Sequence, residues 1–148
     1  FALPGTGAGD SLEQQVYLAT FDTIRHIADQ GPCVIIGRCA DYALAENPNL
    51  LSLFIHAPME ARIQRVARRQ KLTPEEARKT IIKTDKRRAS YYEYYSSKKW
   101  GAVDSYDFCL DSSYLGLSGT VELIRAMVEH KEHPVPSPTE EDPTQSGK

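Results

Sequence analysis

The sequence lacks the features that identify membrane proteins, general nucleic-acid binders and disulfide-rich secreted proteins. No apolar run approaches the length of a membrane span, and no signal peptide is recognisable. The net charge is only −2, which argues against a protein that binds nucleic acids in general. The three cysteines, Cys33, Cys39 and Cys109, lie in or beside apolar runs, which favours buried free thiols over disulfides or a metal site. We therefore expect a protein of the reducing cytoplasm.

The charges that are present are unevenly distributed. Between Arg62 and Lys99 there are thirteen Lys and Arg and four acids, whereas the rest of the chain has five bases and sixteen acids. One basic segment in an otherwise acidic chain suits a small anionic ligand. The charge pattern therefore favours a small anionic ligand over a polynucleotide.

Apolar residues alternate along the chain between strand-like runs and helical stripes. Short apolar runs predict strands at 33–36, 51–56 and 106–110, and the first of these is typical of a strand covered on both faces. Helical periodicity predicts helices at about 11–30, 41–48, 59–70, 73–100 and 118–131. This alternation predicts an α/β fold with a parallel sheet.

One domain and a tail account for the length. A chain of 148 residues, of which 41% are hydrophobic, can bury one core, which we expect over 1–132. Prolines among acidic and small polar residues predict a disordered tail over 133–148. The glycines of residues 1–9 do not form a phosphate-binding loop, because Pro4 precedes them and Asp10 follows them, with no preceding strand and no Gly-Lys-Ser/Thr ending. We interpret them as a flexible loop.

The helix that begins at residue 73 carries the strongest functional signal. Thr73 and Glu76 have the spacing of a capping box, with proline at the first helical position. The residues that share one face of this helix are Ala77, Ile81, Asp85, Arg88 and Tyr92. Charges on an inward face are costly unless they are paired or bind a ligand. Asp85 and Arg88 therefore form either an ion pair near the surface or the wall of a pocket for a phosphorylated ligand.

Other arginines occupy positions where an anion could bind. The run 33–36 ends at a Gly-Arg turn, and ligands of open α/β sheets lie beyond the carboxyl ends of strands, so Arg38 is a candidate. Arg62, Arg65 and Arg69 share one face of the helix after Pro58. Three cations on one face repel each other, so either solvent or a polyphosphate must cover them.

The tyrosines near the end of this long helix allow a different interpretation. Tyr91, Tyr92, Tyr94, Tyr95 and Trp100 lie beside two lysines, and stacking with charge is how single-stranded nucleic acids are bound. Consecutive tyrosines on a helix, however, point in several directions and make a poor stacking platform. We therefore do not expect a nucleic-acid partner.

Five blocks of the sequence closely resemble one family. They are CVIIGR at 33–38, FIHAPMEAR at 54–62, DKRRASYY at 85–92, KWG at 99–101 and YDFCLDS at 106–112. They are similar to the cytidylate kinase-like family of P-loop nucleoside monophosphate kinases, and the similarity extends over roughly residues 12–130. The block from Asp85 to Gly101 is the most specific of them.

The resemblance implies a fold and an activity. The fold would be a P-loop kinase-like parallel sheet flanked by helices, with a helical lid. The reaction would be in-line transfer of the γ-phosphoryl group of ATP, with Mg²⁺, to a nucleoside monophosphate such as CMP. The residues implied for substrate binding are Arg38, Asp41, Asp85, Arg88 and Tyr92. The residues implied for neutralising the phosphates during transfer are Arg62, Arg65 and Arg69.

The sequence departs from the family in two respects. Cytidylate kinases have an aspartate on each side of the Gly-Arg turn, whereas Ile36 and Cys39 stand here, so the acceptor base stays open. The family's amino-terminal segment, with its first strand and Gly-rich P-loop, is absent from the chain. In the family's sheet that strand lies in the middle, between the two strands that are expected here at 33–36 and 51–56. We therefore expect a longer polypeptide or another chain to complete the sheet. The alternative is a catalytically inactive nucleotide-binding or regulatory module of the same fold.

Replacement of Arg88 tests the assignment of the acceptor site. Arg88→Ala should weaken the binding of a nucleoside monophosphate by about 1.5–3 kcal/mol, which is the range for a hydrogen bond to a charged group. The measurement is a calorimetric titration with CMP. Unchanged affinity would remove Arg88 from the site.

Overall fold

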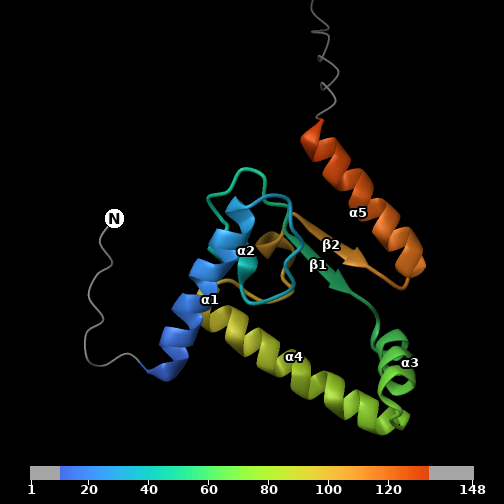
Figure 1. Cartoon of the computed structure of the whole chain (residues 1–148). Helices are drawn as coiled ribbons and strands as arrows, with labels where there is room; N and C mark the ends of the chain where they lie inside the picture. Colours follow the sequence, from blue (N-terminus) through green and yellow to red (C-terminus); the bar gives the residue numbers. More distant parts are fainter. Residues whose placement is uncertain (1–10, 134–148) are drawn as a thin grey trace, which may run out of the picture.

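The computed structural model describes residues 11–133 and has an α/β fold, as predicted (Figure 1). Its elements are helix α1 (Leu12–Asp29), helix α2 (Ala40–Ala43), strand β1 (Leu53–His56), helix α3 (Met59–Gln70), helix α4 (Pro74–Ser96), the 3-10 helix η1 (Val103–Ser105), strand β2 (Phe108–Asp111) and helix α5 (Gly116–Glu132). The loop expected at 1–9 and nearly all of the tail expected at 133–148 lie outside the described residues. The expectation of one domain over 1–132 stays a prediction.

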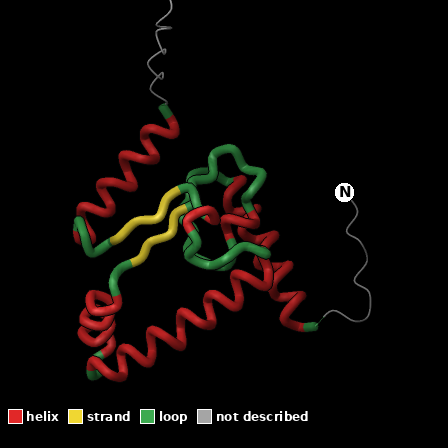
Figure 2. Tube along the Cα trace, turned by 180° about the vertical axis from the view of Figure 1, so that it is seen from behind, coloured by secondary structure: helices red, strands yellow, loops and turns green. Residues whose placement is uncertain are grey.

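The sheet of the described part consists of β1 and β2, which run parallel side by side (Figure 2). Leu53 pairs with Phe108, and His56 pairs with Asp111. Parallel neighbours need a long crossover, and α3 and α4 supply it. Two of the three predicted strands, at 51–56 and 106–110, are therefore confirmed with boundaries shifted by one or two residues.

The strand predicted at 33–36 is wrong. This segment has no regular secondary structure, and Val34 and Ile36 are 92% and 90% exposed. Only Ile35 packs against a core cluster. A strand needs a neighbour for its backbone N–H and C=O groups, and nothing within residues 11–133 pairs with this segment. Cys33 is exposed for the same reason, contrary to expectation, whereas Cys39 is buried, Cys109 is half-buried, and all three thiols are free.

Buried apolar side chains form two clusters among the residues that the structure describes. The first joins α1 to α2 and consists of Ile24, Ala40 and Ala43. The second joins α3 to α4 and consists of Ile63, Ala77 and Ile81. The predicted inward positions of Ala77 and Ile81 are therefore confirmed.

Helix α4 connects the two clusters. Its capping box is formed, because the Thr73 hydroxyl accepts from the Glu76 N–H at 3.3 Å and the Glu76 carboxylate accepts from the Thr73 N–H at 2.8 Å. The pKa of Glu76 is lowered, first by its hydrogen bond with the Thr73 side chain and then by the bond from the Thr73 backbone. In Figure 1, α4 begins beside α3 and ends beside α1, where the rings of Tyr17 and Tyr95 stack with centroids 3.8 Å apart.

Helix α5 lies on the other side of the strands from α4 in both views (Figures 1 and 2). It begins five residues beyond Asp111, the end of β2, and near its own end the Lys131 ammonium donates to the carbonyl of Leu50 at 2.5 Å. Several of its apolar side chains are exposed, including Leu117 and Val121. No helix within residues 11–133 combines the length and the apolar character that a membrane crossing requires.

Two neighbouring isoleucines of α4 provide a test of the second cluster. Ile81→Ala should lower the free energy of unfolding by about 2–4 kcal/mol, because it leaves a cavity between α3 and α4. The matched control is Ile82→Ala, since Ile82 is 53% exposed while Ile81 is 4% exposed. The control should change stability by no more than about 0.5 kcal/mol. Equal losses in urea unfolding would contradict the packing described here.

Candidate functional site

The candidate site lies at the carboxyl ends of β1 and β2. The strand register brings His56 beside Asp111, and the chain turns back through Ser112. Ser112 is buried, and both its N–H and its hydroxyl donate to the carbonyl of His56, at 2.9 Å and 3.1 Å. The Arg65 Nη1 of α3 donates to the same hydroxyl at 3.4 Å. The structure therefore brings a predicted phosphate-binding arginine to the edge of the sheet where ligands of α/β proteins bind.

Arg62 of α3 binds Asp85 of α4. Its two terminal nitrogens contact the two carboxylate oxygens, with Nη1–Oδ2 and Nη2–Oδ1 both at 2.7 Å. The side chains are 30% and 22% exposed. A two-pronged contact of this kind is both stronger and more directional than a single charged hydrogen bond. The partner of Asp85 is thus an arginine of the neighbouring helix and not Arg88 on its own helix.

Two other predicted cations are exposed. The side chains of Arg69, at the end of α3, and Arg88, one turn beyond Asp85, make no ion pair or hydrogen bond with another described residue. The predicted inward face of α4 is buried at Ala77, at Ile81 and again at Tyr92, but it is uncovered at Arg88. The reason is that α3 packs only against the first part of α4.

Arg38 lies in a backbone turn of uncommon geometry. Gly37, Arg38 and Cys39 have φ values of 73°, 59° and 54°, so two residues with side chains adopt the left-handed conformation in succession. The Arg38 guanidinium lies 6.0 Å from the centre of the Tyr91 ring. Burial, and secondarily the charge of Asp41, raises the pKa of the Cys39 thiol to about 11. Cys39 is therefore an inert thiol, and Arg38 extends to solvent.

Asp41 and Tyr92, both predicted to bind substrate, bind each other. The Tyr92 hydroxyl donates to Asp41 Oδ2 at 2.6 Å, and its ring stacks on Tyr106 with centroids 5.8 Å apart. Burial, followed by the hydrogen bond to Asp41, raises the pKa of Tyr92 above its ordinary value of 10.0. The pair joins α2 to the far part of α4 and lies in a different part of the fold from Arg62 and Arg65.

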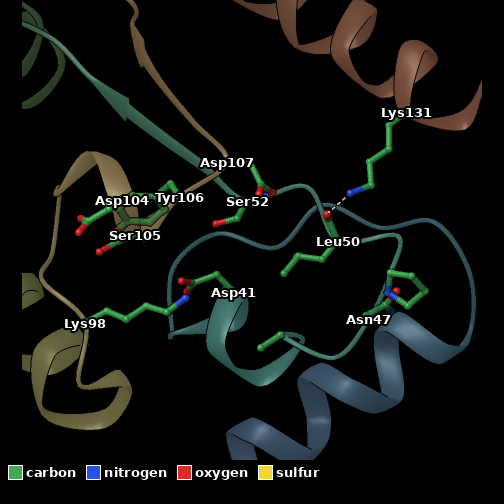
Figure 3. Close-up of a pocket in the computed structure, with 12 residues that line it drawn as sticks. Asp41, Asn47, Leu50, Ser52, Lys98, Asp104, Ser105, Tyr106, Asp107 and Lys131 are labelled. Carbon is green, nitrogen blue, oxygen red and sulfur yellow. Dashed lines mark hydrogen bonds between the residues drawn. The ribbon is translucent and has the colours of Figure 1, made fainter. Parts of the chain in front are cut away.

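A cavity of about 330 Å³ opens at the opposite, amino-terminal end of the strands (Figure 3). Its polar lining includes Asp41, Ser52, Lys98, Asp104, Asp107 and Lys131. Several of these groups are already engaged, since the Ser52 N–H donates to the Asp107 carboxylate at 2.7 Å and Lys131 donates to Leu50. Asp41 is the only predicted site residue in this lining. The cavity therefore does not collect the arginines.

Three residues of the strand edge were missed by the sequence analysis, namely His56, Ser112 and Ser113. The Asp111 pKa is lowered, first by the hydrogen bond from the Ser113 hydroxyl, at 2.6 Å, then by the bond from the Ser113 N–H, at 2.8 Å. The charge of His56 adds to this effect. A signal for these residues was available, because His56 is the polar last residue of the strand predicted at 51–56, and Ser112 and Ser113 follow closely on the strand predicted at 106–110.

Comparison with known proteins identifies the family to which the chain is similar. The family model described as "Cytidylate kinase-like family" matches residues 3–114. The chain belongs to the cytidylate kinase-like family. This result confirms the resemblance found in the sequence blocks, and it covers the strands, α3, α4 and the turn after β2.

Individual proteins of known name or structure share a modest sequence identity with this chain. The chain is 28% identical over 113 residues to the cytidylate kinase of Methanopyrus kandleri, covering 71% of this chain and 58% of the relative. It is 29% identical over 105 residues to that of Methanosarcina acetivorans, covering 70% and 58%. A crystal structure of an uncharacterized protein from Eubacterium ventriosum matches with a TM-score of 0.75 at 29% identity, covering 80% of this chain and 74% of that one. The chain thus spans about three fifths of the length of its curated relatives.

Alkaline unfolding tests whether Asp41 and Tyr92 form a structural pair. The pKa of Tyr92 is higher in the folded state, so its contribution to stability is complete below the unfolded pKa near 10 and is lost as pH rises through the folded pKa. Tyr92→Phe should lower the free energy of unfolding at pH 7 by about 1–3 kcal/mol, because a half-buried carboxylate loses its donor. It should also reduce the further loss of stability above pH 10.

The measurement is urea unfolding at pH 7 and pH 11. Tyr94→Phe is the matched control, since Tyr94 is 79% exposed on the same helix. If the two variants behave alike, the hydrogen bond to Asp41 does not stabilise the fold.

Proposed function

We propose that the chain supplies the acceptor and lid portion of a nucleoside monophosphate kinase. The observation that supports this is the grouping of Arg62, Arg65 and Asp85, from two helices, around the carboxyl ends of β1 and β2. The reaction is transfer of the γ-phosphoryl group of ATP to a monophosphate, with CMP as the first candidate. Membership of the cytidylate kinase-like family supports the same reaction class.

Six of the predicted residues have a role in this proposal, whereas Asp41 and Tyr92 bind each other. Phosphoryl transfer places little covalent chemistry on the protein, so catalysis depends on positioning and on neutralising the phosphate oxygens. Arg62, Arg65 and Arg69 of α3 supply the positive charge over the transferred group. Asp85 accepts a hydrogen bond from the sugar or base of the acceptor. Arg38 and Arg88 bind the acceptor phosphate.

Membership of the cytidylate kinase-like family supports ATP and Mg²⁺ as the phosphoryl donor and its metal ion. The arginines of α3 suit the phosphates of ATP, since a guanidinium fork matches two phosphate oxygens. Within residues 11–133, no three His, Cys, Asp or Glu side chains gather into a group that could hold a metal ion.

A further strand belongs to the proposed enzyme. In the described sheet β1 pairs only with β2, so one edge of β1 is free. Val34 and Ile36, in the segment that the sequence predicts to be a strand, are almost fully exposed. A strand from a longer polypeptide, or from another chain, would pair with β1 and cover these side chains. The greater length of the curated relatives supports this reading, and the free thiols suit a cytoplasmic enzyme.

A second candidate function is a nucleotide-binding or regulatory module without catalysis. Ile36 and Cys39 favour it, because cytidylate kinases have aspartates on either side of the Gly-Arg turn. The mass of the intact natural protein discriminates between the two. A polypeptide longer by about 60–90 residues, as the size of such domains predicts, favours the enzyme.

Calorimetric titration of the 148-residue chain, first with CMP and then with ATP and Mg²⁺, tests the proposal. CMP should bind, because the proposed acceptor residues Arg38, Asp85 and Arg88 are all within the described part of the chain, whereas ATP should bind weakly without the family's phosphate loop. Uridine monophosphate and adenosine monophosphate serve as matched acceptors that report base preference. Absence of binding for every monophosphate would contradict the proposed acceptor site in this chain.

A further inference from the structure

Arg62 and Asp85, which are expected to bind different groups of the nucleotides, bind each other in this structure. Arg62 is expected to neutralise phosphates, and Asp85 is expected to bind the sugar or base of the acceptor. Both oxygens of Asp85 lie 2.7 Å from the guanidinium of Arg62. A ligand hydroxyl or amino group that takes the place of the guanidinium must therefore separate this pair.

The other polar contacts of α3 are either exposed to solvent or made with an uncharged group. Arg78 of α4 contacts Glu60 of α3 at 2.9 Å, but the two side chains are 49% and 76% exposed. Arg65 reaches only the neutral hydroxyl of Ser112. Among the three arginines of the α3 face, Arg62 is thus the one whose charge is neutralised by a carboxylate within the described part of the chain.

We propose that the Arg62–Asp85 pair is a latch that acceptor binding opens. In the free protein, Asp85 holds Arg62 away from the phosphate position. An acceptor nucleoside monophosphate binds Asp85 with its sugar or base, and its phosphate, which Arg38 and Arg88 also bind, then lies beside the released Arg62. The proposal rests on the proposed function, and it deepens that function by adding coupling between the two sides of the same site.

The latch selects for a phosphorylated ligand. A neutral hydroxyl or amino group cannot replace a bidentate, charge-assisted contact at equal strength, so a nucleoside bears the full cost of opening the pair. A nucleoside monophosphate compensates this cost, because its dianionic phosphate gives the guanidinium a new partner. When only a small fraction of the protein is in the state that can bind a ligand, the apparent affinity for that ligand is reduced by the same fraction. The latch therefore lowers the affinity for nucleosides more than the affinity for nucleotides.

The experiment compares cytidine with CMP in calorimetric titrations of the 148-residue chain. Arg62→Gln should bind cytidine about three- to tenfold more tightly than the unmodified chain, because Asp85 is released. The same variant should prefer CMP over cytidine by a smaller factor than the unmodified chain does, because the phosphate of CMP can no longer contact the guanidinium of Arg62. The matched control is Arg78→Gln, which removes the exposed ion pair between the same two helices and should leave both affinities unchanged.

Two further variants separate the latch from general effects on folding. In an Asp85→Asn background, Arg62→Gln should give no gain in cytidine affinity, because the gain requires the released carboxylate. Arg62→Lys keeps the charge but loses the fork, so its cytidine affinity should lie between those of the unmodified chain and Arg62→Gln. Circular dichroism verifies that each variant retains its helix content.

The outcomes distinguish the latch from the proposed function. Cytidine affinity that is equal or weaker in Arg62→Gln, with CMP binding intact in the unmodified chain, overturns the latch alone. In that case Arg62 orients Asp85 for the ligand instead of competing with it. No binding of CMP or cytidine by any variant overturns the proposed function, and the latch with it.

Discussion

Parallel pairing of β1 with β2 determines where Arg62, Arg65 and Asp85 of the candidate site lie. The register ends both strands at the same edge, so that the carbonyl of His56 receives two hydrogen bonds from Ser112. Helix α3 begins three residues beyond His56, which leaves its arginines little freedom of position relative to that edge. The crossover through α3 and α4 then brings Asp85 back beside Arg62. The pairing of the strands thus fixes the positions of α3 and α4, and these helices bring Arg62 and Asp85 together.

The parts of the fold that could be predicted are those decided by local sequence. The capping box at Thr73 and the buried positions of Ala77 and Ile81 depend on helical spacing alone, and the structure agrees with them. The strand at 33–36 could not be predicted in this way, because apolar β-branched residues form a strand only beside another strand. In residues 11–133 that neighbour is missing, and Val34 and Ile36 are exposed instead.

The candidate site shows the same division. The choice of Arg62, Arg65 and Asp85 followed from residue type and spacing, but their partners did not. Spacing along α4 offered Arg88 as the partner of Asp85, whereas helix packing supplies Arg62. Asp41 and Tyr92 lie fifty-one residues apart in sequence, and their hydrogen bond depends on the docking of α2 against α4. Contacts between elements depend on tertiary packing, which a periodic pattern does not contain.

The degree of burial of the Arg62–Asp85 pair is what suits it to a reversible role. A fully exposed ion pair contributes about 0–1 kcal/mol and would hold little in place. A fully buried pair is costly to separate, since an uncompensated charge would remain in the interior at about 3–5 kcal/mol. With 30% and 22% of its side chains exposed, this pair lies between the two limits. Solvent can take part in its opening, and an anionic ligand at the neighbouring edge of the sheet can compensate the guanidinium that is released.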